Sequence, residues 1–224
     1  MNLMPANVDQ RSRKTQERAV VTQRAILRAA YDEFARVGFQ GASLRNIGDT
    51  AKVNHRLINH HFGSKLDLWK ATAAYAFGDF HDRLAKRLEG LSGVSDTETI
   101  KLMFREFILH AASEPALNKF MLQANDEPER MRWLVDTYIN PPTRDSVLVK
   151  PNHDYVAAIR RAQALNIFVA GDPQTLWYIF AGSATSIFAY HEEFEQVTGV
   201  SPFDHDLLEE HVETVLGLFF RHPK

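Results

Sequence analysis

One short segment of the chain combines side chains that can contact nucleic acid. Residues 54–60 contain two asparagines, two histidines and one arginine: Asn54, His55, Arg56, Asn59 and His60. Side chains of these types form hydrogen bonds with base edges in the DNA major groove and with phosphates. Ile58 and Phe62 are four residues apart, which favours a short helix with one apolar side. The spacing therefore predicts a helix whose polar side can read DNA.

Basic and hydroxyl residues stand on both sides of this segment. Ser43 precedes an apolar-periodic run and predicts a helix cap, where the free amides of the first turn attract phosphate. Arg45 and Lys65 can each contact a phosphate group. Four more basic residues predict a flexible arm that follows the DNA backbone or a minor groove: Arg11, Arg13, Lys14 and Arg18.

The histidines do not have the spacing of a metal site. His55 and His60 are five residues apart, whereas two ligands on one helical face are four apart. No histidine has an acidic residue three positions before it, so the Glu-x-x-His pairs of a di-iron bundle are absent. His191 and His205 are each followed by a glutamate four residues later, a spacing that favours solvated ion pairs. We therefore expect no metal ion.

Signatures of catalysis and of cofactor binding are also missing from the sequence. The chain has no cysteine, which excludes disulfides, thiolate metal sites, iron-sulfur clusters and a cysteine nucleophile. It has no G-x-S-x-G elbow, no P-loop and no G-x-G-x-x-G fingerprint. We expect neither enzymatic activity nor a cofactor.

Three predicted helices hold the polar segment. Apolar residues at steps of three and four predict a helix over residues 22–38 that ends at Gly38. Ser43 opens a second helix that reaches residue 51, and a turn over residues 52–54 leads to a third helix over residues 55–61. The last two have the proportions of a helix-turn-helix, whose second helix enters the major groove.

Charge is distributed unevenly along the 224 residues. The formal net charge is -2, but residues 1–70 have 12 basic and 6 acidic side chains, whereas residues 71–224 have 14 basic and 22 acidic ones. The first part therefore has a net charge of +6 and the second a net charge of -8. A basic first third suits a polyanionic partner, and an acidic body keeps the remaining surface away from DNA.

Further helices account for the rest of the chain. Ser64 and Asp67 have the spacing of a capping box, which opens a long helix that ends near Gly90. Residues 141–153 predict a loop or an irregular helix, and only residues 146–150 show the alternation of a strand. The other apolar-periodic segments are residues 97–113, 115–124, 127–139, 155–166, 173–198 and 204–222. We predict an all-α fold.

The basic part resembles a known family. The segment SLRNIGDTAKVNHRLINHHFGSKLDLW resembles the DNA-binding domain of the TetR family of bacterial transcription regulators, and ILRAAYDEFARVGFQGAS resembles its first helix and turn. The resemblance covers roughly residues 20–70. It implies that Ser43 and Lys65 bind phosphates and that Asn54 and His55 begin the recognition helix. It also places His60 and His61 at the family's aromatic pair, with His61 facing inward.

Three positions depart from the family pattern. Lys52 stands where the turn usually has glycine, Arg56 where a small residue is common, and Asn59 where tyrosine is common. A left-handed backbone at Lys52 would cost about 1 kcal/mol. The other two departures change the face that reads DNA, so the operator sequences of better-known relatives do not transfer.

We divide the chain into a flexible basic arm (residues 1–19), a three-helix helix-turn-helix DNA-binding domain (20–66) and a larger helical ligand-binding and dimerisation domain (67–224). The N-terminal residues lack the apolar core of a secretory signal. Polar residues interrupt the longest stretch without charge, residues 173–190. We therefore expect a soluble, cytoplasmic protein.

The last two predicted helices indicate a homodimer. The helix over residues 173–198 is apolar on two sides. One side is expected to be buried against its own domain and the other against a further surface outside that domain. The helix over residues 204–222 has an apolar stripe of Leu208, Val212, Val215 and Phe219. We predict that both helices pair with their copies in a four-helix interface, as the resemblance also implies, so that two recognition helices meet a near-palindromic operator.

The resemblance implies a small-molecule effector that binds in the larger domain and releases the operator. The candidate ligand residues are mostly aromatic and suit a mainly apolar molecule: Phe104, Phe107, His110, Met121, Trp133, Trp177 and Phe180. The predicted function is thus that of a DNA-binding transcriptional regulator, in this family usually a repressor. Two alternatives stay open: a helical ligand-binding protein or enzyme that does not act on DNA, and a protein whose basic arm binds a membrane surface.

Overall fold

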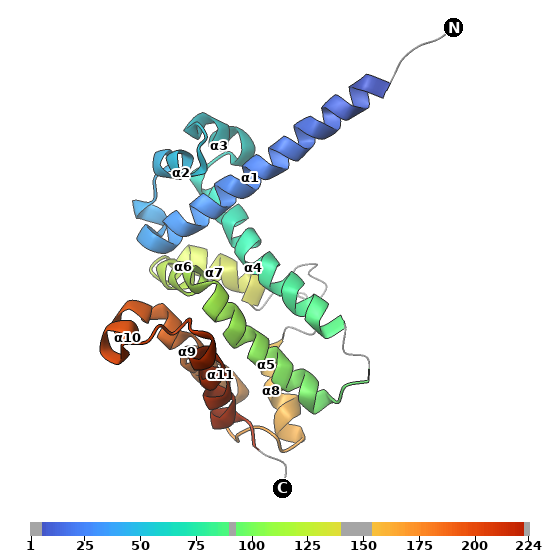
Figure 1. Ribbon diagram of the computed structural model, residues 1–224, viewed down its shortest axis with the longest axis vertical. Coiled ribbons are helices and arrows are strands. Elements are labelled where there is room, and N and C mark those ends of the chain that lie inside the picture. Colours follow the sequence, from blue (N-terminus) through green and yellow to red (C-terminus); the bar gives the residue numbers. More distant parts are fainter. Residues whose placement is uncertain (1–5, 90–92, 140–153, 222–224) are drawn as a thin grey trace. The chain divides into compact units, whose positions relative to one another are not determined.

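A computed structural model describes residues 6–89, 93–139 and 154–221 (Figure 1). Within these ranges the chain forms eleven α-helices and one π-helical segment, and only an isolated bridge between Phe168 and Phe220 has β geometry. The prediction of an all-α fold is confirmed. The chain divides into two compact units, Met1–Ala76 and Phe77–Lys224, and the boundary falls inside one helix, α4.

Unit 1 contains the predicted helix-turn-helix. It consists of α1 (Ala6–Gly41), α2 (Leu44–Ala51), α3 (His55–Phe62) and the first turns of α4 (Lys65–Glu89). Positive φ at Gly38 (70°) interrupts α1 and lets the ring of Phe39 stack on Phe34 at 6.1 Å. A common core buries apolar side chains of all four helices: Ile26, Ala30, Phe34, Ile47, Ile58, Leu68 and Trp69.

The first helix begins earlier than the sequence pattern predicted. Residues 6–19, predicted to belong to a flexible arm, form the first turns of α1. No proline or glycine stands between Pro5 and Gly38, and Gln, Arg, Lys, Glu and Ala are good helix formers. The basic residues of this region therefore stand on a helix. The structure describes the side chains of Arg13 and Arg18, which are exposed, but not those of Arg11 and Lys14.

The turn between α2 and α3 is tight. Lys52 ends α2 in the left-handed region, at φ 57° and ψ 38°, and the amide of Val53 donates to the carbonyl of Gly48 at 2.9 Å. A Cβ atom at Gly48 would lie 2.8 Å from the carbonyl oxygen of Val53. Glycine is therefore needed at residue 48, whereas residue 52 holds a lysine in a conformation that favours glycine.

Unit 2 continues α4 and adds the remaining helices. They are α5 (Asp96–Ser113), α6 (Pro115–Asn125), α7 (Pro128–Leu134), the π-helical η1 (Val135–Ile139), α8 (Tyr155–Ala164), α9 (Pro173–Ala189), α10 (His191–Thr198) and α11 (His205–Phe219). Helices α5, α8, α9 and α11 surround an aromatic core in which Phe104 packs edge-on against Phe180 at 4.6 Å. Residues 141–153, predicted as a loop or an irregular helix with the alternation of a strand over residues 146–150, lie outside the described residues.

The predicted helix over residues 173–198 is two helices. The break falls at Tyr190, which ends α9 and precedes α10. The two helices differ in burial, because α9 buries Phe180, Ala184 and Phe188 in the core whereas α10 buries no residue. In the described residues, no helix has the length and apolar character that a bilayer crossing requires.

The apolar stripe of α11 has a different role from the predicted one. Val212, Val215 and Phe219 are buried in the core of unit 2, and Leu208 packs against that core. They are therefore covered within the chain and do not form an open face. The large apolar side chains that α9 and α11 leave exposed are Tyr178, Ile179 and Leu218.

Candidate nucleic-acid interface

Side-chain caps begin both helices of the helix-turn-helix. The Ser43 hydroxyl accepts a hydrogen bond from the amide of Arg45 at 3.2 Å, and the side-chain oxygen Oδ1 of Asn54 accepts one from the amide of Arg56 at 2.9 Å. Both capping residues have extended backbones, as N-caps require. Asn54 thus stands at the start of α3, and a base contact through the same oxygen would compete with its cap.

Helix α3 exposes a continuous polar face. His55, Arg56, Asn59 and His60 are exposed, whereas Ile58 is buried in the core of unit 1. At 3.6 residues per turn, these four positions span an arc of about 140°. An α-helix with such a face fits the width of the DNA major groove. The candidates of the sequence analysis on α3 are therefore brought together on one surface.

Helix α1 supports the opposite side of α3. The Nε2 atom of Gln23 lies 3.4 Å from Nδ1 of His61, and the His61 ring contacts the rings of His60 and Phe62 at 5.7 and 6.2 Å. His61 is half-buried, in line with the inward position that the resemblance implies. The exposed face of α3 therefore rests on a packed support, which holds its side chains in position.

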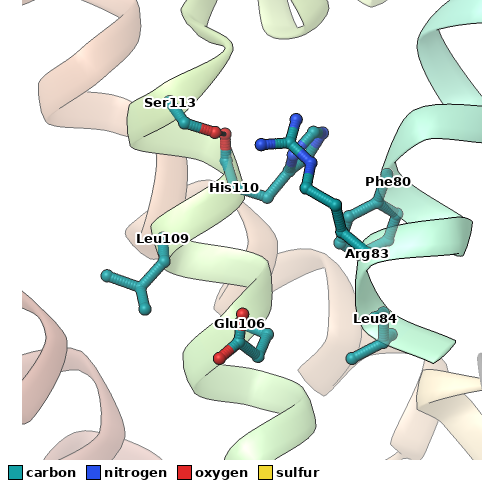
Figure 2. Close-up of a pocket in the computed structure, with 7 residues that line it drawn as sticks. All are labelled: Phe80, Arg83, Leu84, Glu106, Leu109, His110 and Ser113. Carbon is teal, nitrogen blue, oxygen red and sulfur yellow. Dashed lines mark hydrogen bonds between the residues drawn. The ribbon is translucent and has the colours of Figure 1, made fainter. Parts of the chain in front are cut away.

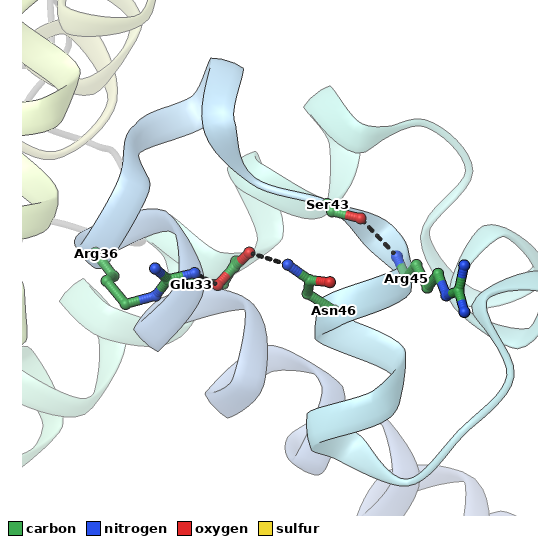
Figure 3. Close-up of polar contacts among 5 residues, drawn as sticks. All are labelled: Glu33, Arg36, Ser43, Arg45 and Asn46. Atoms are coloured by element: carbon green, nitrogen blue, oxygen red, sulfur yellow. Dashed lines mark hydrogen bonds and ion pairs between the residues drawn. The ribbon is translucent and has the colours of Figure 1, made fainter.

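A buried carboxylate joins α1 to the start of α2 (Figure 3). Glu33 is 9% exposed and accepts hydrogen bonds from Nδ2 of Asn46 at 3.2 Å and from Nη2 of Arg36 at 2.6 Å. Burial opposes its ionisation, but the hydrogen bonds, the charge of Arg36 and the backbone amide of Ser43 hold the pKa of Glu33 below its usual value. This network fixes the end of α2 from which Ser43 and Arg45 would meet a phosphate.

Glu33 is not among the site residues predicted from the sequence, although the sequence contains a signal for it. Glu33 stands three residues after Ala30 and seven after Ile26, both on the apolar stripe of α1. A charged residue on a buried stripe requires a partner. The partner Asn46 lies on another helix, so only the folded chain identifies it.

Lys65 and Arg45 lie at helix starts that flank α3. The Lys65 ammonium lies 3.3 Å from the carbonyl oxygen of Gln40 and 4.8 Å from the centre of the Phe39 ring. The predicted capping box spans Lys65, with the Ser64 amide donating to the Asp67 carboxylate and the Asp67 amide donating to the Ser64 hydroxyl, both at 3.1 Å. Arg45 is exposed in the first turn of α2. Both cations thus stand on ordered elements of unit 1.

The predicted ligand residues do not line one cavity. Phe104 and Phe180 are fully buried in the core of unit 2, and Phe107 and Trp177 pack against that core. Met121 is half-buried on α6, and Trp133 on α7 contacts Tyr138 at 5.7 Å. Of the predicted set, only His110 lines the pocket of Figure 2.

That pocket has a volume of about 220 Å³ and lies between α4 and α5. Its lining residues are Phe80, Arg83, Leu84, Glu106, Leu109, His110 and Ser113. The rings of Phe80 and His110 are 4.5 Å apart, and His110 is 9% exposed. Among the described residues, no group of three or more metal-ligating side chains comes together.

Comparisons with known proteins agree with this geometry. A family model for bacterial regulatory proteins of the tetR family matches residues 26–72. The HTH-type transcriptional repressor NicS of Pseudomonas putida is 36% identical over 78 residues, which are 34% of this chain and 37% of that protein. The HTH-type transcriptional regulatory protein RaaS of Mycobacterium tuberculosis is 30% identical over 159 residues, which are 69% of each chain. The chain thus spans little more than a third of NicS.

Solved structures share the fold over most of the chain. A Clostridium perfringens protein, described as a fatty acid metabolism regulator, superposes with a TM-score of 0.63 at 17% sequence identity. The superposition covers 86% of this chain and 97% of that one. Both units therefore have relatives of the same architecture.

Proposed function

The chain belongs to the TetR family of bacterial transcriptional regulators, and we propose that it acts as a ligand-responsive repressor that binds its operator as a homodimer. The observation that carries the proposal is the exposed polar face of α3. This helix begins at the Asn54 cap and packs against α1 through Gln23 and His61. The similar protein NicS is named as a transcriptional repressor. A location in the cytoplasm follows from DNA as the partner.

The proposed contacts divide into base readers and phosphate binders. Arg56, Asn59 and His60, together with His55, meet base edges in the major groove, since they share the exposed arc of α3. Ser43, Arg45 and Lys65 bind phosphates, because they stand at helix starts beside this arc. Asn54 caps the start of the recognition helix and contacts DNA at the edge of the surface that α3 presents.

Salt-dependent binding tests this division. Lys65→Ala should weaken binding to every sequence alike and reduce the slope of log K against log[salt] by about 1. Arg56→Ala should cost about 1–3 kcal/mol on the specific site and relax the preference at one base step. If both variants lose the same affinity on specific and on random DNA, the division of roles is wrong.

The proposed dimer uses the exposed side of α9 and α11. Tyr178 is 71% exposed and Leu218 is 62% exposed, and Ile179 lies beside Tyr178 on α9. Exposed apolar side chains on neighbouring helices suit burial against a second copy. Two recognition helices then meet half-sites about 34–36 Å apart, or a multiple of that spacing. Sedimentation that shows only monomers at micromolar concentration would contradict this part of the proposal.

The proposed release of DNA runs through α4. This helix contributes to unit 1 with Lys65 and Trp69 and to the pocket of unit 2 with Phe80 and Arg83. We suppose two conformations of the protein that differ in the placement of α4. A ligand that binds one conformation more tightly than the other raises its population and so changes the arrangement of the recognition helices. Selecting bound fragments from the genome identifies the operator. Absence of salt-dependent duplex binding would favour the alternative of a helical binding protein that does not act on DNA.

A further inference from the structure

A second cavity of unit 2 is a groove between α5 and α11, which run side by side (Figure 1). Its volume is about 380 Å³, and it shares no lining residue with the pocket between α4 and α5. Leu102, Leu216 and Phe220 give the groove its apolar surface, and Phe220 is buried. A concave apolar surface with a few polar groups is the usual form of a small-molecule site.

Two cations that line the groove have no acidic partner. In the described part of the chain, neither the Lys101 ammonium nor the Arg221 guanidinium forms a hydrogen bond or an ion pair. Nζ of Lys101 lies 6.0 Å from the centre of the Phe220 ring. The backbone amide of Arg221 donates to the carbonyl of Ile167 at 2.8 Å, which fixes the point from which the Arg221 side chain extends. Two charged groups with N–H donors are therefore available to a ligand.

The other charged groups of the groove already have partners. Arg105 forms ion pairs with Glu209 and Glu213. Glu98 accepts hydrogen bonds from the amide and the hydroxyl of Ser95, at 3.3 and 2.9 Å, and so completes the cap of α5. The start of α5 and the end of α11 lie at the same end of the groove, so their opposite helix dipoles offset each other. A cationic ligand would have to compete with Arg105 or with this cap for an acceptor.

The groove lies on a different side of α11 from the proposed dimer interface. Leu216 lines the groove, whereas Leu218, the exposed apolar residue of the proposed interface, stands two residues later. Two residues turn an α-helix by about 200°, so these two side chains point in nearly opposite directions. A ligand can therefore reach the groove in the monomer and in the proposed dimer.

We propose that this groove is a binding site for a small carboxylate with an apolar body. The carboxylate head lies at Lys101 and Arg221, and the body lies on Leu102, Leu216 and Phe220. A guanidinium suits such a head, since it binds a carboxylate through two parallel donors. The inference goes beyond the proposed function, because the site lies apart from α4 and its binding of a ligand needs no DNA.

Hexanoate is a suitable probe of the ligand class. Its eight non-hydrogen atoms need about 240 Å³ at the roughly 30 Å³ that a water-sized group takes in a liquid, so it fits the groove. We would titrate the full chain with hexanoate, and with hexanamide and hexylammonium as neutral and cationic controls, while recording backbone amide signals by NMR.

Hexanoate should shift the amide signals of residues 98–105 and 213–221. Hexanamide should bind about 10-fold more weakly, because hydrogen bonds to ionised groups are about twice as strong as those between neutral groups. Hexylammonium should bind more weakly still, since the two unpaired side chains repel it. Three results would each overturn the proposal: no binding of hexanoate, signal shifts only on other helices, or a control compound that binds as tightly as hexanoate.

Charge variants test the assigned residues. Arg221→Gln and Lys101→Gln should each weaken hexanoate binding about 10-fold, because each removes one charged donor. Arg161→Gln and Lys119→Gln are the matched controls, since both residues are exposed cations of unit 2 outside the lining. Thermal unfolding checks that each variant folds. If Arg221→Gln and Lys101→Gln bind hexanoate as tightly as the wild type, the assignment of the head group is wrong.

A steric variant tests the location. Gly217 lines the groove on α11, and apart from its chain neighbours and its own helical backbone no heavy atom lies within 4 Å of a Cβ atom at this position. Gly217→Leu should therefore fold, fill part of the groove and abolish hexanoate binding, whereas Gly217→Ala should keep most of it. A folded Gly217→Leu variant that binds hexanoate as the wild type does would overturn the location of the site.

Discussion

Replacing Lys52 by glycine should stabilise the chain. A residue other than glycine in the left-handed region costs about 1–2 kcal/mol, and Lys52 stands there at φ 57° and ψ 38°. Glycine removes this cost, but ordering the more flexible glycine backbone on folding costs about 0.5–1 kcal/mol more in conformational entropy. Since the Lys52 side chain is exposed, its removal takes little packing away. The expected net gain is about 0.5–1 kcal/mol.

Two measurements check this gain. Hydrogen exchange of the amides in α2 and α3 should slow, because a more stable structure opens less often. A gain of about 0.5–1 kcal/mol corresponds to roughly two- to fivefold slower exchange. The midpoint of thermal unfolding should rise by about 1–4 °C for a chain of this length. Lys52→Ala is the control, because it removes the same charge and keeps a Cβ atom. If the glycine and alanine variants unfold at the same temperature, backbone strain at residue 52 does not explain the effect.

Other positions give further expectations. Glu33→Gln should lower the free energy of unfolding by about 1–3 kcal/mol at pH 7, since it weakens charged hydrogen bonds. Folding lowers the pKa of Glu33. Its ionised carboxylate therefore contributes to the free energy of unfolding at pH values above the ordinary pKa of 4.5, and this contribution is lost as the pH falls through the folded pKa. The stability difference between variant and wild type should consequently shrink in acid denaturation curves. Gly48→Ala should destabilise unit 1 by about 1–3 kcal/mol in urea unfolding, because its Cβ meets the carbonyl oxygen of Val53 at 2.8 Å. Tyr178→Glu should shift sedimentation toward the monomer, because a charge enters the proposed interface.

Three results would contradict these expectations. They are a constant stability difference between Glu33→Gln and the wild type from pH 7 to pH 3, an unchanged urea midpoint for Gly48→Ala, and an unchanged sedimentation coefficient for Tyr178→Glu. Ile179→Ala on the same helix serves as a milder control for the last variant, since it removes apolar surface without adding charge.

Local sequence patterns determined most of unit 1. The caps at Ser43 and Asn54 and the capping box at Ser64 form between residues two or three apart, so the sequence alone places them. The stacking of Phe39 on Phe34 depends on the nearby Gly38, and the polar side of α3 follows from the helical period. The sequence alone therefore identified the helix-turn-helix and the exposed polar side of α3, because these features depend on near neighbours.

Only the tertiary structure decided which apolar residues form the core and where a pocket remains. Aromatic residues at helical spacing look alike in a sequence, whether they pack as Phe104 does or line a cavity. The pocket brings together Arg83 and His110, which are 27 residues apart on two helices. Likewise, Glu33 meets Asn46 only when α1 packs against α2. Contacts of this kind arise from the packing of whole helices, and no local period records which side of a helix faces which neighbour.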